Sequence, residues 1–313
     1  MKRLTVLDGY AMNPGDLSWD KLREYFEVEV YDRTPADKVI ERIGDSCAIL
    51  VNKVAITDEI MAACPNLKYI GVNATGYNVI DTEAAHKRSI TVTNVPAYST
   101  DAVAQHVFAF ITNYTNRVYE HSITVKNGDW VKCPDFCYWN SPLMELSGKT
   151  LGIYGYGSIG KKSAEIGKAF GMNVIACSRT PKDGVENVTL NQLLEQSDFI
   201  TLHSPLTPQT NGIINKETLS KMKKSAVLIN TARGGLIVEA DLANALNNGD
   251  IAAYCADVVS VEPMAKDNPL LNAKNCYITP HLAWAPLETR QRLMNVVIEN
   301  IKAWLNGKPQ NVV

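Results

Sequence analysis

The feature that most constrains the fold is a glycine-rich segment in the middle of the chain. Residues 155–160 read Gly-Tyr-Gly-Ser-Ile-Gly and directly follow the apolar run 150–154. After them, Ala164 and Ile166 begin a helical pattern, and a second apolar run comes at 173–177. A strand, a glycine turn, a helix and a second strand together predict a parallel βαβ unit.

This glycine turn predicts a dinucleotide-binding site. In such turns the first glycine permits the sharp bend, the second lets the backbone approach a pyrophosphate, and the third lets helix and strand pack closely. The helix N-terminus adds N–H groups and the positive end of a dipole. A glycine-rich turn without a ligand is the alternative. The expected cofactor-binding residues here are Gly155, Tyr156, Gly157, Ser158, Ile159 and Gly160.

The residues after the run at 173–177 should distinguish NAD from NADP. An acidic residue there would accept hydrogen bonds from the ribose 2′-hydroxyl of NAD. The chain continues instead with Ser178, Arg179 and Thr180. A guanidinium and two hydroxyls suit a 2′-phosphate, although a solvated basic turn is the alternative. These residues favour NADP and leave NAD possible.

Short β-branched runs alternate with helical patterns, which predicts an α/β protein with parallel sheets. The predicted strands lie at 4–8, 28–31, 48–51, 69–72, 91–95, 150–154, 173–177, 199–202, 226–230, 252–257 and 276–279. The predicted helices include 19–26, 57–64, 101–127 and 286–305, with Asp101 as a candidate cap for the third.

Composition excludes several classes of function. The 313 residues carry a net charge of −2, so nucleic acid and anionic membranes are not expected partners. No apolar run reaches the roughly 20 residues of a membrane span. The cysteines are scattered, and the close pair Cys133 and Cys137 lacks further ligands at zinc spacing. We expect no metal and a reduced, cytoplasmic protein.

Three further segments carry reactive side chains. Arg233 follows the run at 226–230, Glu262 lies in Asp-Val-Val-Ser-Val-Glu-Pro, and His281 lies in Thr-Pro-His-Leu-Ala-Trp. With the glycine turn, and in this order, they make the chain resemble the D-isomer-specific 2-hydroxyacid dehydrogenases over essentially its whole length. The resemblance implies two Rossmann-like or flavodoxin-like domains, with the nucleotide domain inserted into a discontinuous substrate domain. It places the substrate domain at 1–99 and 286–313, and the nucleotide domain at 100–285.

The resemblance also implies roles for these side chains. His281 would be the acid/base, Glu262 its partner, and Arg233 the cation that holds the substrate carboxylate. Reduction of a 2-keto acid needs such groups, because hydride goes to the carbonyl carbon while a proton goes to its oxygen. Asp257 would orient the nicotinamide carboxamide, and Thr231 would also contact the cofactor. Taken singly, a loop histidine, a turn glutamate and a structural arginine are the alternatives.

On the substrate side, the resemblance points to the loop with Thr75 and Gly76, and Asn52 is a candidate wall of the same site. An ordinary turn is the alternative. Segments 74–78, 135–139 and 281–285 are similar to the glycerate dehydrogenase (hydroxypyruvate reductase) branch. This implies NAD(P)H-dependent reduction of a small 2-keto acid, above all hydroxypyruvate or glyoxylate, to the D-2-hydroxy acid.

Other readings stay open. A lactate-type substrate, phosphite oxidation, and a nicotinamide-sensing, corepressor-like binding protein are the alternatives. Formate enzymes of this fold carry glutamine where Glu262 stands, which argues against formate. The family also implies a homodimer supported by the helix at 101–127. The aromatic segment Phe136–Trp139 either reaches a neighbouring subunit's site or packs as a surface loop.

Overall fold

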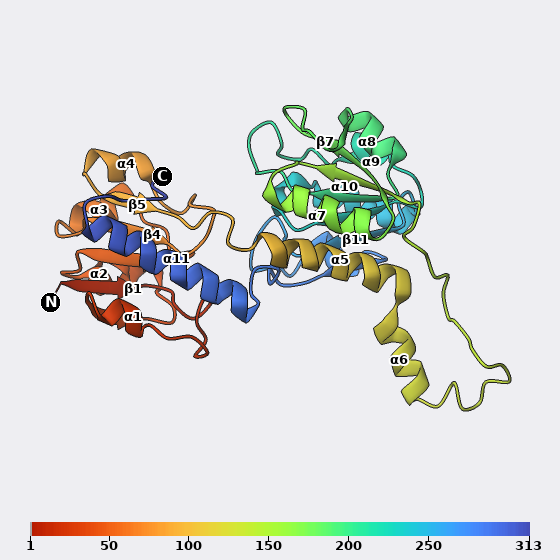
Figure 1. Ribbon diagram of the computed structural model, residues 1–313, viewed down its shortest axis with the longest axis horizontal. Helices are drawn as coiled ribbons and strands as arrows, with labels where there is room; N and C mark the ends of the chain where they lie inside the picture. The colour runs from red at the N-terminus through yellow and green to blue at the C-terminus, as the bar shows by residue number, and fades with distance from the viewer. Residues whose placement is uncertain (1) are drawn as a thin grey trace. The chain divides into compact units, whose positions relative to one another are not determined.

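The computed structural model describes residues 2–313, and the chain divides into two compact units. The terminal unit combines the chain up to Ser99 with Trp284–Val313, and the central unit is the continuous segment Thr100–Ala283 (Figure 1). One unit is thus inserted into the other along the sequence. No helix in the part of the chain that the structure describes is both long and apolar enough to cross a membrane.

The terminal unit is built on a five-stranded parallel sheet with the order β2-β1-β3-β4-β5. Alternate residues of β3 point to opposite faces: Ala48 and Leu50 join one core, and Ile49 and Val51 the other. The strands are β1 (Arg3–Val6), β2 (Glu27–Val30), β3 (Ala48–Val51), β4 (Tyr69–Val72) and β5 (Thr91–Thr93).

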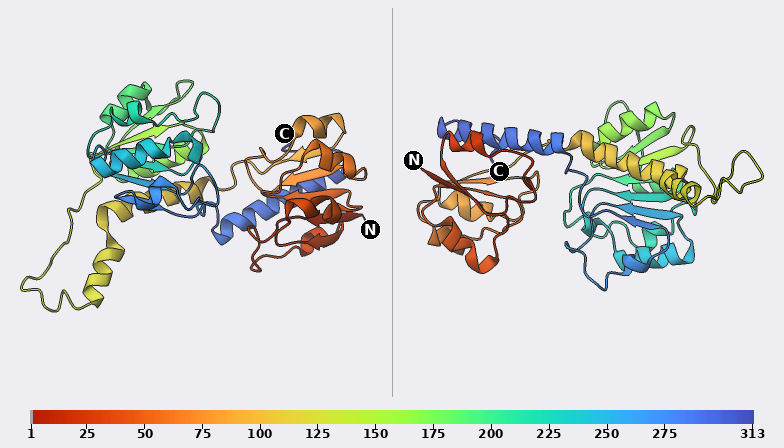
Figure 2. Two further views of the ribbon diagram at one scale, coloured as in Figure 1. Left: turned by 180° about the vertical axis from the view of Figure 1, so that it is seen from behind. Right: turned by 90° about the horizontal axis from the view of Figure 1, so that it is seen from below.

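Helices cover both faces of this sheet, as the right-hand view of Figure 2 shows. One layer consists of α1 (Asp20–Arg23) and the long α11 (Leu287–Leu305), which buries Leu293, Val297 and Ile301 against the sheet. The other layer consists of α2 (Val39–Ile43), α3 (Asp58–Ala63) and α4 (Thr82–Lys87), preceded by a 3-10 turn, η1 (Ala36–Lys38). The second segment of the terminal unit is therefore part of its core.

The last residues of the chain lie beside β5. Thr93 and Val312 form an antiparallel bridge. Asn94 N donates to the carbonyl of Asn311 (3.1 Å), and Val313 N donates to that of Val92 (3.0 Å).

The central unit contains a seven-stranded parallel sheet with the order β12-β11-β10-β9-β6-β7-β8. The chain starts in the middle at β6 and builds outward in both directions, which is the doubly wound arrangement. The strands are β6 (Thr150–Tyr154), β7 (Asn173–Cys177), β8 (Glu186–Asn187), β9 (Phe199–Leu202), β10 (Val227–Asn230), β11 (Ala253–Ala256) and β12 (Cys276–Ile278).

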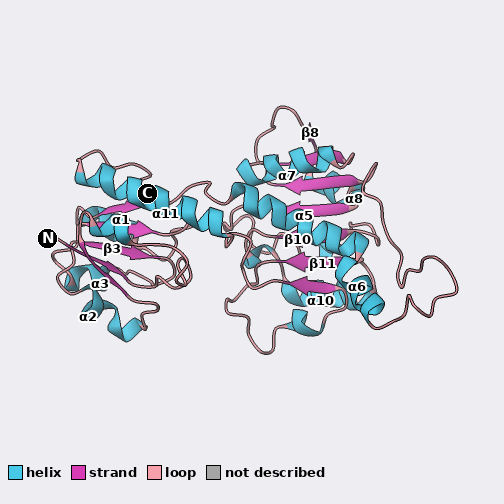
Figure 3. Ribbon diagram, turned by 60° about the horizontal axis from the view of Figure 1, so that its bottom comes forward, coloured by secondary structure: helices cyan, strands magenta, loops and turns pink. Residues whose placement is uncertain are grey.

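Both faces of the central sheet are buried by helices (Figure 3). Val227 and Ile229 of β10 pack toward α5 (Thr100–Asn116) and α7 (Ser158–Ala169). Leu228 faces the opposite core, which α8 (Leu190–Gln196), α9 (Lys216–Leu219) and α10 (Glu239–Asn248) complete. Burial on both sides explains the nearly continuous apolar runs of these strands. The 3-10 turns η2 (Gly234–Leu236) and η3 (Pro269–Asn272) lie in the loops.

The predicted class, α/β with two parallel sheets, is confirmed, but several predicted helices differ. The stretch 101–127 is two helices, α5 and α6 (Val118–Lys126), separated by Arg117 in the left-handed conformation (φ 47°). The apolar period ends with α5, because α6 buries no residue at all. Asp101 is not the cap: the helix already begins at Thr100, and Asp101 contacts Lys162 (3.4 Å). The predicted helix 19–26 shrinks to the four residues of α1, and the two-residue β8 was not predicted.

Candidate active site

The candidate site of the central unit lies along one edge of its sheet. In a parallel sheet the carboxyl ends of all strands meet at the same edge, where doubly wound proteins bind ligands. The glycine turn follows β6, Thr231 and Arg233 follow β10, and Asp257 and Glu262 follow β11. His281 follows β12. Four segments that are distant in sequence therefore meet at one edge.

Glu262 and His281 form a hydrogen-bonded pair. His281 Nδ1 lies 2.6 Å from Glu262 Oε2, and about a third of each side chain is exposed (32% and 33%). The backbone N–H of Val259 donates to the other carboxylate oxygen (3.3 Å). A carboxylate at Nδ1 fixes the ring orientation and places the proton of the neutral ring on Nδ1. Nε2 is then the nitrogen that can exchange a proton with a ligand.

The backbone of His281 lies in the left-handed region, with φ 51°. This conformation is uncommon for a residue with a side chain and persists where the surroundings enforce it. Here His281 N donates to the carbonyl of Thr279 (2.9 Å), and the residues that follow are held by Asp257.

Asp257 is an internal anchor for the segment that carries His281. Its side chain is 1% exposed and accepts hydrogen bonds from Thr279 Oγ1 (2.6 Å), Leu282 N (2.8 Å) and Ala283 N (2.8 Å). These contacts differ from the nicotinamide contact that the family resemblance implies for Asp257. In the structure, Asp257 holds the residues on both sides of His281 by hydrogen bonds.

His106 of α5 is a participant that the sequence analysis did not single out. Its Nε2 lies 3.0 Å from Thr279 Oγ1 and 3.7 Å from Asp257 Oδ1. Burial lowers the pKa of His106, against the opposing charge of Asp257. The available signal was a histidine between Val103, Val107 and Phe110 on the apolar face of a helix.

The glycine turn has the geometry that a dinucleotide pyrophosphate requires. Gly155 has φ 96°, and a Cβ there would lie 2.8 Å from the backbone of His203. A Cβ on Gly160 would lie 2.2 Å from the carbonyl oxygen of Gly155, so these two glycines are required by packing. Gly157 differs, since nothing lies within 4 Å of its Cβ position. Its outer side is open just where α7 begins, and no side chain caps that N-terminus.

Two further residues at this edge bear on a cofactor. Thr231 has a buried hydroxyl without a hydrogen-bond partner among residues 2–313, and a bound ligand would satisfy it. His203, under the glycine turn, contacts Thr201 Oγ1 (3.0 Å) and Ser163 Oγ (3.3 Å). Burial lowers the pKa of His203 to about 3, so this ring stays neutral at physiological pH. Together with the open side of Gly157, these residues fit a dinucleotide.

The residues after β7 form a short polar turn. Ser178 Oγ donates to the carbonyl of Thr180 (2.7 Å). Arg179 is exposed and makes no ion pair with any residue that the structure describes. Its guanidinium is thus available to a ligand at the end of β7.

Arg233 projects from a loop braced by buried Asn230. Asn230 Nδ2 donates to the carbonyl of Arg233 (2.9 Å), and Ala232 N donates to Asn230 Oδ1 (3.0 Å). The next residue, Gly234, lies against the Glu262 loop: a Cβ on it would lie 1.9 Å from the carbonyl carbon of Val259. Only glycine permits this contact between the Arg233 and Glu262 loops. Gly234 was not predicted, although its place directly after Arg233 was a signal.

The predicted substrate residues of the terminal unit lie at the carboxyl ends of β3 and β4. The Asp8 carboxylate accepts the backbone N–H groups of Asn52 (2.7 Å) and Lys53 (2.6 Å) and so shapes the first loop. Thr75 Oγ1 donates to the carbonyl of Val95 (2.8 Å), and Gly76 follows it. Asn73 is 1% exposed, and neither of its side-chain polar atoms has a hydrogen-bond partner in the part of the chain that the structure describes.

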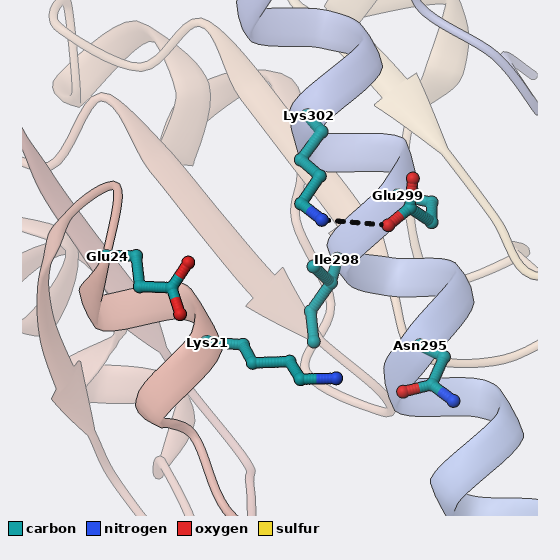
Figure 4. A pocket seen from close by; sticks show the side chains of 6 residues that line it. All are labelled: Lys21, Glu24, Asn295, Ile298, Glu299 and Lys302. Atoms are coloured by element: carbon teal, nitrogen blue, oxygen red, sulfur yellow. Dashed lines mark hydrogen bonds and ion pairs between the residues drawn. The ribbon is translucent and has the colours of Figure 1, made fainter.

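Two shallow hollows of the terminal unit have none of the predicted site residues in their lining. One lies at the carboxyl ends of β1 to β3 and includes Arg33 and Lys53. The other lies between α1 and α11 (Figure 4), where Lys302 pairs with Glu299 (3.0 Å) beside Lys21 and Glu24. Its mixed charges and exposed setting give it no evident chemistry. No cluster of His, Cys, Asp and Glu suited to a metal occurs among residues 2–313.

Comparison with known proteins identifies the family. Residues 108–283 match the model described as D-isomer specific 2-hydroxyacid dehydrogenase, NAD binding domain. The chain is 47% identical to hydroxypyruvate reductase of Blautia hydrogenotrophica, with 99% of each chain covered. It is 41% identical to glycerate dehydrogenase of Methylorubrum extorquens, covering 100% of this chain and 99% of the relative.

A solved structure gives the same result. The NADPH-dependent glyoxylate/hydroxypyruvate reductase of Sinorhizobium meliloti, in complex with NADP and malonate, has a TM-score of 0.86. It is 32% identical, with 100% of this chain and 96% of that one covered. The chain therefore belongs to the D-isomer specific 2-hydroxyacid dehydrogenase family. It is an NAD(P)-dependent oxidoreductase that acts on CH–OH donors, so the predicted family and enzyme class are confirmed.

Proposed function

We propose that this enzyme reduces hydroxypyruvate to D-glycerate, and glyoxylate to glycolate, with NADPH as the preferred reductant. The observation that carries the proposal is the 2.6 Å contact between His281 Nδ1 and Glu262 Oε2, at the sheet edge that also carries Arg233 and the glycine turn. The names of the relatives support the substrate class.

Each side chain has a distinct task in this reaction. When bound, the reduced nicotinamide supplies the hydride. His281 donates a proton from Nε2 to the substrate carbonyl oxygen, and Glu262 stabilises the charged ring and holds its orientation. Arg233 binds the substrate carboxylate through its planar fork. In the terminal unit, Asn52, Thr75 and Gly76 are the proposed substrate contacts.

The assignment of the two units follows from these roles. The central unit, Thr100–Ala283, corresponds to the predicted coenzyme domain 100–285, in which Gly155, Gly157, Gly160 and Thr231 would hold the pyrophosphate and nicotinamide ends. The terminal unit corresponds to the predicted substrate domain, 1–99 and 286–313. Asp257 contributes by fixing the His281 turn. The seven cysteines form no disulfide, which supports a cytoplasmic location.

The first experiment measures NAD(P)H oxidation with hydroxypyruvate, glyoxylate, pyruvate and longer 2-keto acids. We expect the highest kcat/KM for hydroxypyruvate or glyoxylate. His281→Ala should lower kcat by roughly 10²–10⁴-fold while coenzyme binding, measured by NADPH fluorescence, is retained. Near-normal turnover of this variant would contradict the assignment of the acid/base. If none of the keto acids causes NAD(P)H to be oxidised, a binding role or phosphite as the substrate would be favoured.

The preference for NADPH rests on Ser178, Arg179 and Thr180, where an NAD-binding acidic residue is lacking. Arg179→Ala should lower kcat/KM for NADPH by about tenfold or more and change the value for NADH little, because only NADPH carries the 2′-phosphate. Lys182→Ala, a nearby loss of positive charge, is the matched control. A wild-type enzyme that prefers NADH would refute this part of the proposal.

The protein is proposed to act as a homodimer. The arm, which we define as α6 and residues 127–145, projects from the rest of the central unit (Figure 1). It exposes large apolar side chains, and an isolated nine-residue helix without buried residues is only marginally stable in water. A second copy that covers the arm explains both features. The most exposed of these side chains are Val118 (70%), Tyr119 (72%), Val131 (88%), Phe136 (89%) and Trp139 (64%).

A further inference from the structure

Glu239 is the first residue of α10, and both of its carboxylate oxygens accept hydrogen bonds from the loop that leads to Glu262. Its Oε1 accepts Ser260 N (2.7 Å), and its Oε2 accepts Ser260 Oγ (2.7 Å) and Asn268 Nδ2 (2.8 Å). Hydrogen bonds to a carboxylate are shorter and stronger than those between neutral groups. The first turn of a ten-residue helix also favours a negative charge. Ser260 is therefore held at two atoms by one side chain.

Ser260, which Glu239 holds, is the neighbour of a residue that contacts the acid–base pair. The residue before Ser260, Val259, donates its N–H to Glu262 Oε1 (3.3 Å). Glu262 Oε2 in turn lies 2.6 Å from His281 Nδ1. A shift of Ser260 moves Val259 and Glu262 with it, because these residues lie within one short turn. The orientation of the His281 ring follows the position of Glu262.

The same loop is held from a second side. Gly234 lies so close to the Val259–Ser260 peptide that a Cβ would be 1.9 Å from Val259 C and 2.3 Å from Ser260 N. Gly234 directly follows Arg233, and the segment from Arg233 continues into Glu239 within six residues. One stretch of chain thus carries the proposed carboxylate-binding arginine at its start and the anchor of the acid–base loop at its end.

We propose that Glu239 is a positioning residue for the reaction, which sets the geometry of Glu262 and His281 through Ser260. Its hydrogen bonds are to Ser260 and Asn268, so it acts through the loop and not through a bound ligand. Its role rests on the proposed function, since it acts only through the acid–base pair. A carboxylate that merely fastened α10 to a loop would support the fold without affecting the chemical step.

The first test uses Glu239→Gln. Glutamine has nearly the same size, but it cannot accept all three hydrogen bonds, because one acceptor oxygen becomes an N–H₂ donor facing a donor. We expect kcat with hydroxypyruvate to fall about ten- to a hundredfold, as sub-ångström to 1 Å misplacement of a reacting group does. The Kd for NADPH should stay unchanged. Asp241→Asn is the matched control: it lies in the same turn of α10, accepts Lys216 N (2.9 Å), and should keep wild-type kcat.

The second test is a double-mutant cycle with Glu262→Gln, measured in single turnovers so that slow variants remain quantifiable. If Glu239 acts through Glu262, then adding Glu239→Gln to Glu262→Gln should cost less than twofold further. Full additivity of the two losses would overturn the proposal, as would wild-type kcat in Glu239→Gln. If Glu239→Gln does not fold, Ser260→Ala replaces it, since that variant loses only the Oγ hydrogen bond and should show a smaller loss with the same non-additivity.

Failure of this inference is distinguishable from failure of the proposed function. If His281→Ala and Glu262→Gln lose activity while Glu239→Gln does not, only the positioning role of Glu239 is refuted. If His281→Ala retains near-normal turnover, the acid–base assignment itself is wrong and the cycle loses its basis.

Discussion

Individual backbone positions, as much as side chains, define the acid–base pair. His281 has a positive φ, and Gly234 tolerates no Cβ. Both features bring segments together more closely than ordinary residues permit. Arg233, Glu262 and His281 could be proposed as site residues because of the family resemblance, and each follows a recognisable strand. The close contact of Gly234 and the anchoring roles of Asp257 and Glu239 could not be predicted, because their partners lie tens of residues away and no local pattern records such contacts.

Gly234 offers a prediction at the residue scale. Gly234→Ala places a Cβ 1.9 Å from the Val259 backbone, so the two loops must separate. We expect the substitution to lower the free energy of unfolding by about 1–3 kcal/mol and to lower kcat strongly. The measurements are urea unfolding and steady-state kinetics. Gly235→Ala is the control, because its Cβ would meet the movable end of the Leu206 side chain at 2.9 Å. Equal effects of the two substitutions would argue against the special role of Gly234.

Among the elements, α5 and α6 show how far apolar periodicity can predict the extent of a helix. The predicted single helix is correct through Asn116 because its apolar residues face α7 and the sheet. Beyond Arg117 the helix buries no residue, and its contacts include hydrogen bonds of Thr124 and His121 to Tyr138 and Asn140 in the loop that follows. The break could not be predicted without knowing where the core ends.

The helix α11 is joined to the N-terminal loop by a buried arginine. Arg290, 8% exposed, binds both oxygens of Asp16 (2.6 Å each) and donates to the carbonyl of Ala285 (2.8 Å). The hydrogen bond from Arg290 lowers the pKa of Asp16 below 3.8. A carboxyl whose pKa is lower in the folded state contributes stability above its unfolded pKa, and this contribution disappears as the pH falls through the folded value.

Asp16→Asn should therefore lower the Tm at pH 7, and the difference from the wild type should shrink as the pH falls below about 4. Thermal unfolding at a series of pH values measures this. Asp20→Asn removes the same charge from the exposed pair with Arg23 and should have a smaller effect at pH 7. A Tm difference for Asp16→Asn that does not depend on pH would mean that the ion pair is not its cause.

At the scale of the whole molecule, the two units differ in how their cores are assembled. Both cores of the central unit use residues of Thr100–Ala283 alone. The terminal unit depends on two segments, because α11 supplies Leu293, Met294, Val297, Ile298 and Ile301 to its core. Alternating strands and helices could be predicted from sequence for both units. The joining of distant segments came from the family resemblance, since periodicity does not record which sheet a helix covers.

This difference predicts how fragments behave. Residues 100–283 expressed alone should unfold cooperatively and bind NADPH, because that unit contains its own cores. Residues 1–99 alone should lack a cooperative transition, and a peptide of residues 284–313 should restore it. Thermal unfolding followed by circular dichroism checks both. A cooperatively folded 1–99 fragment would show that α11 is dispensable for the terminal core.

Assembly is testable at the same scale. Tyr119→Glu places a charge in the middle of the arm and should convert a dimer into monomers, as measured by analytical ultracentrifugation. Ile40→Asp, which alters an exposed apolar residue of the terminal unit (46%), is the control and should leave the dimer intact. A wild-type monomer at micromolar concentration would refute the dimer.

The segment Asn311–Val313 bears on whether copies of the protein associate through the edges of their sheets. β5 is the last strand of its sheet, and an outer strand offers unpaired N–H and C=O groups to any passing chain. The antiparallel bridge between Thr93 and Val312, with its two flanking hydrogen bonds, occupies those groups. The chain thus blocks strand-by-strand growth from that side with its own tail. Removing Asn311–Val313 would expose this edge of the sheet and lower the solubility of the enzyme.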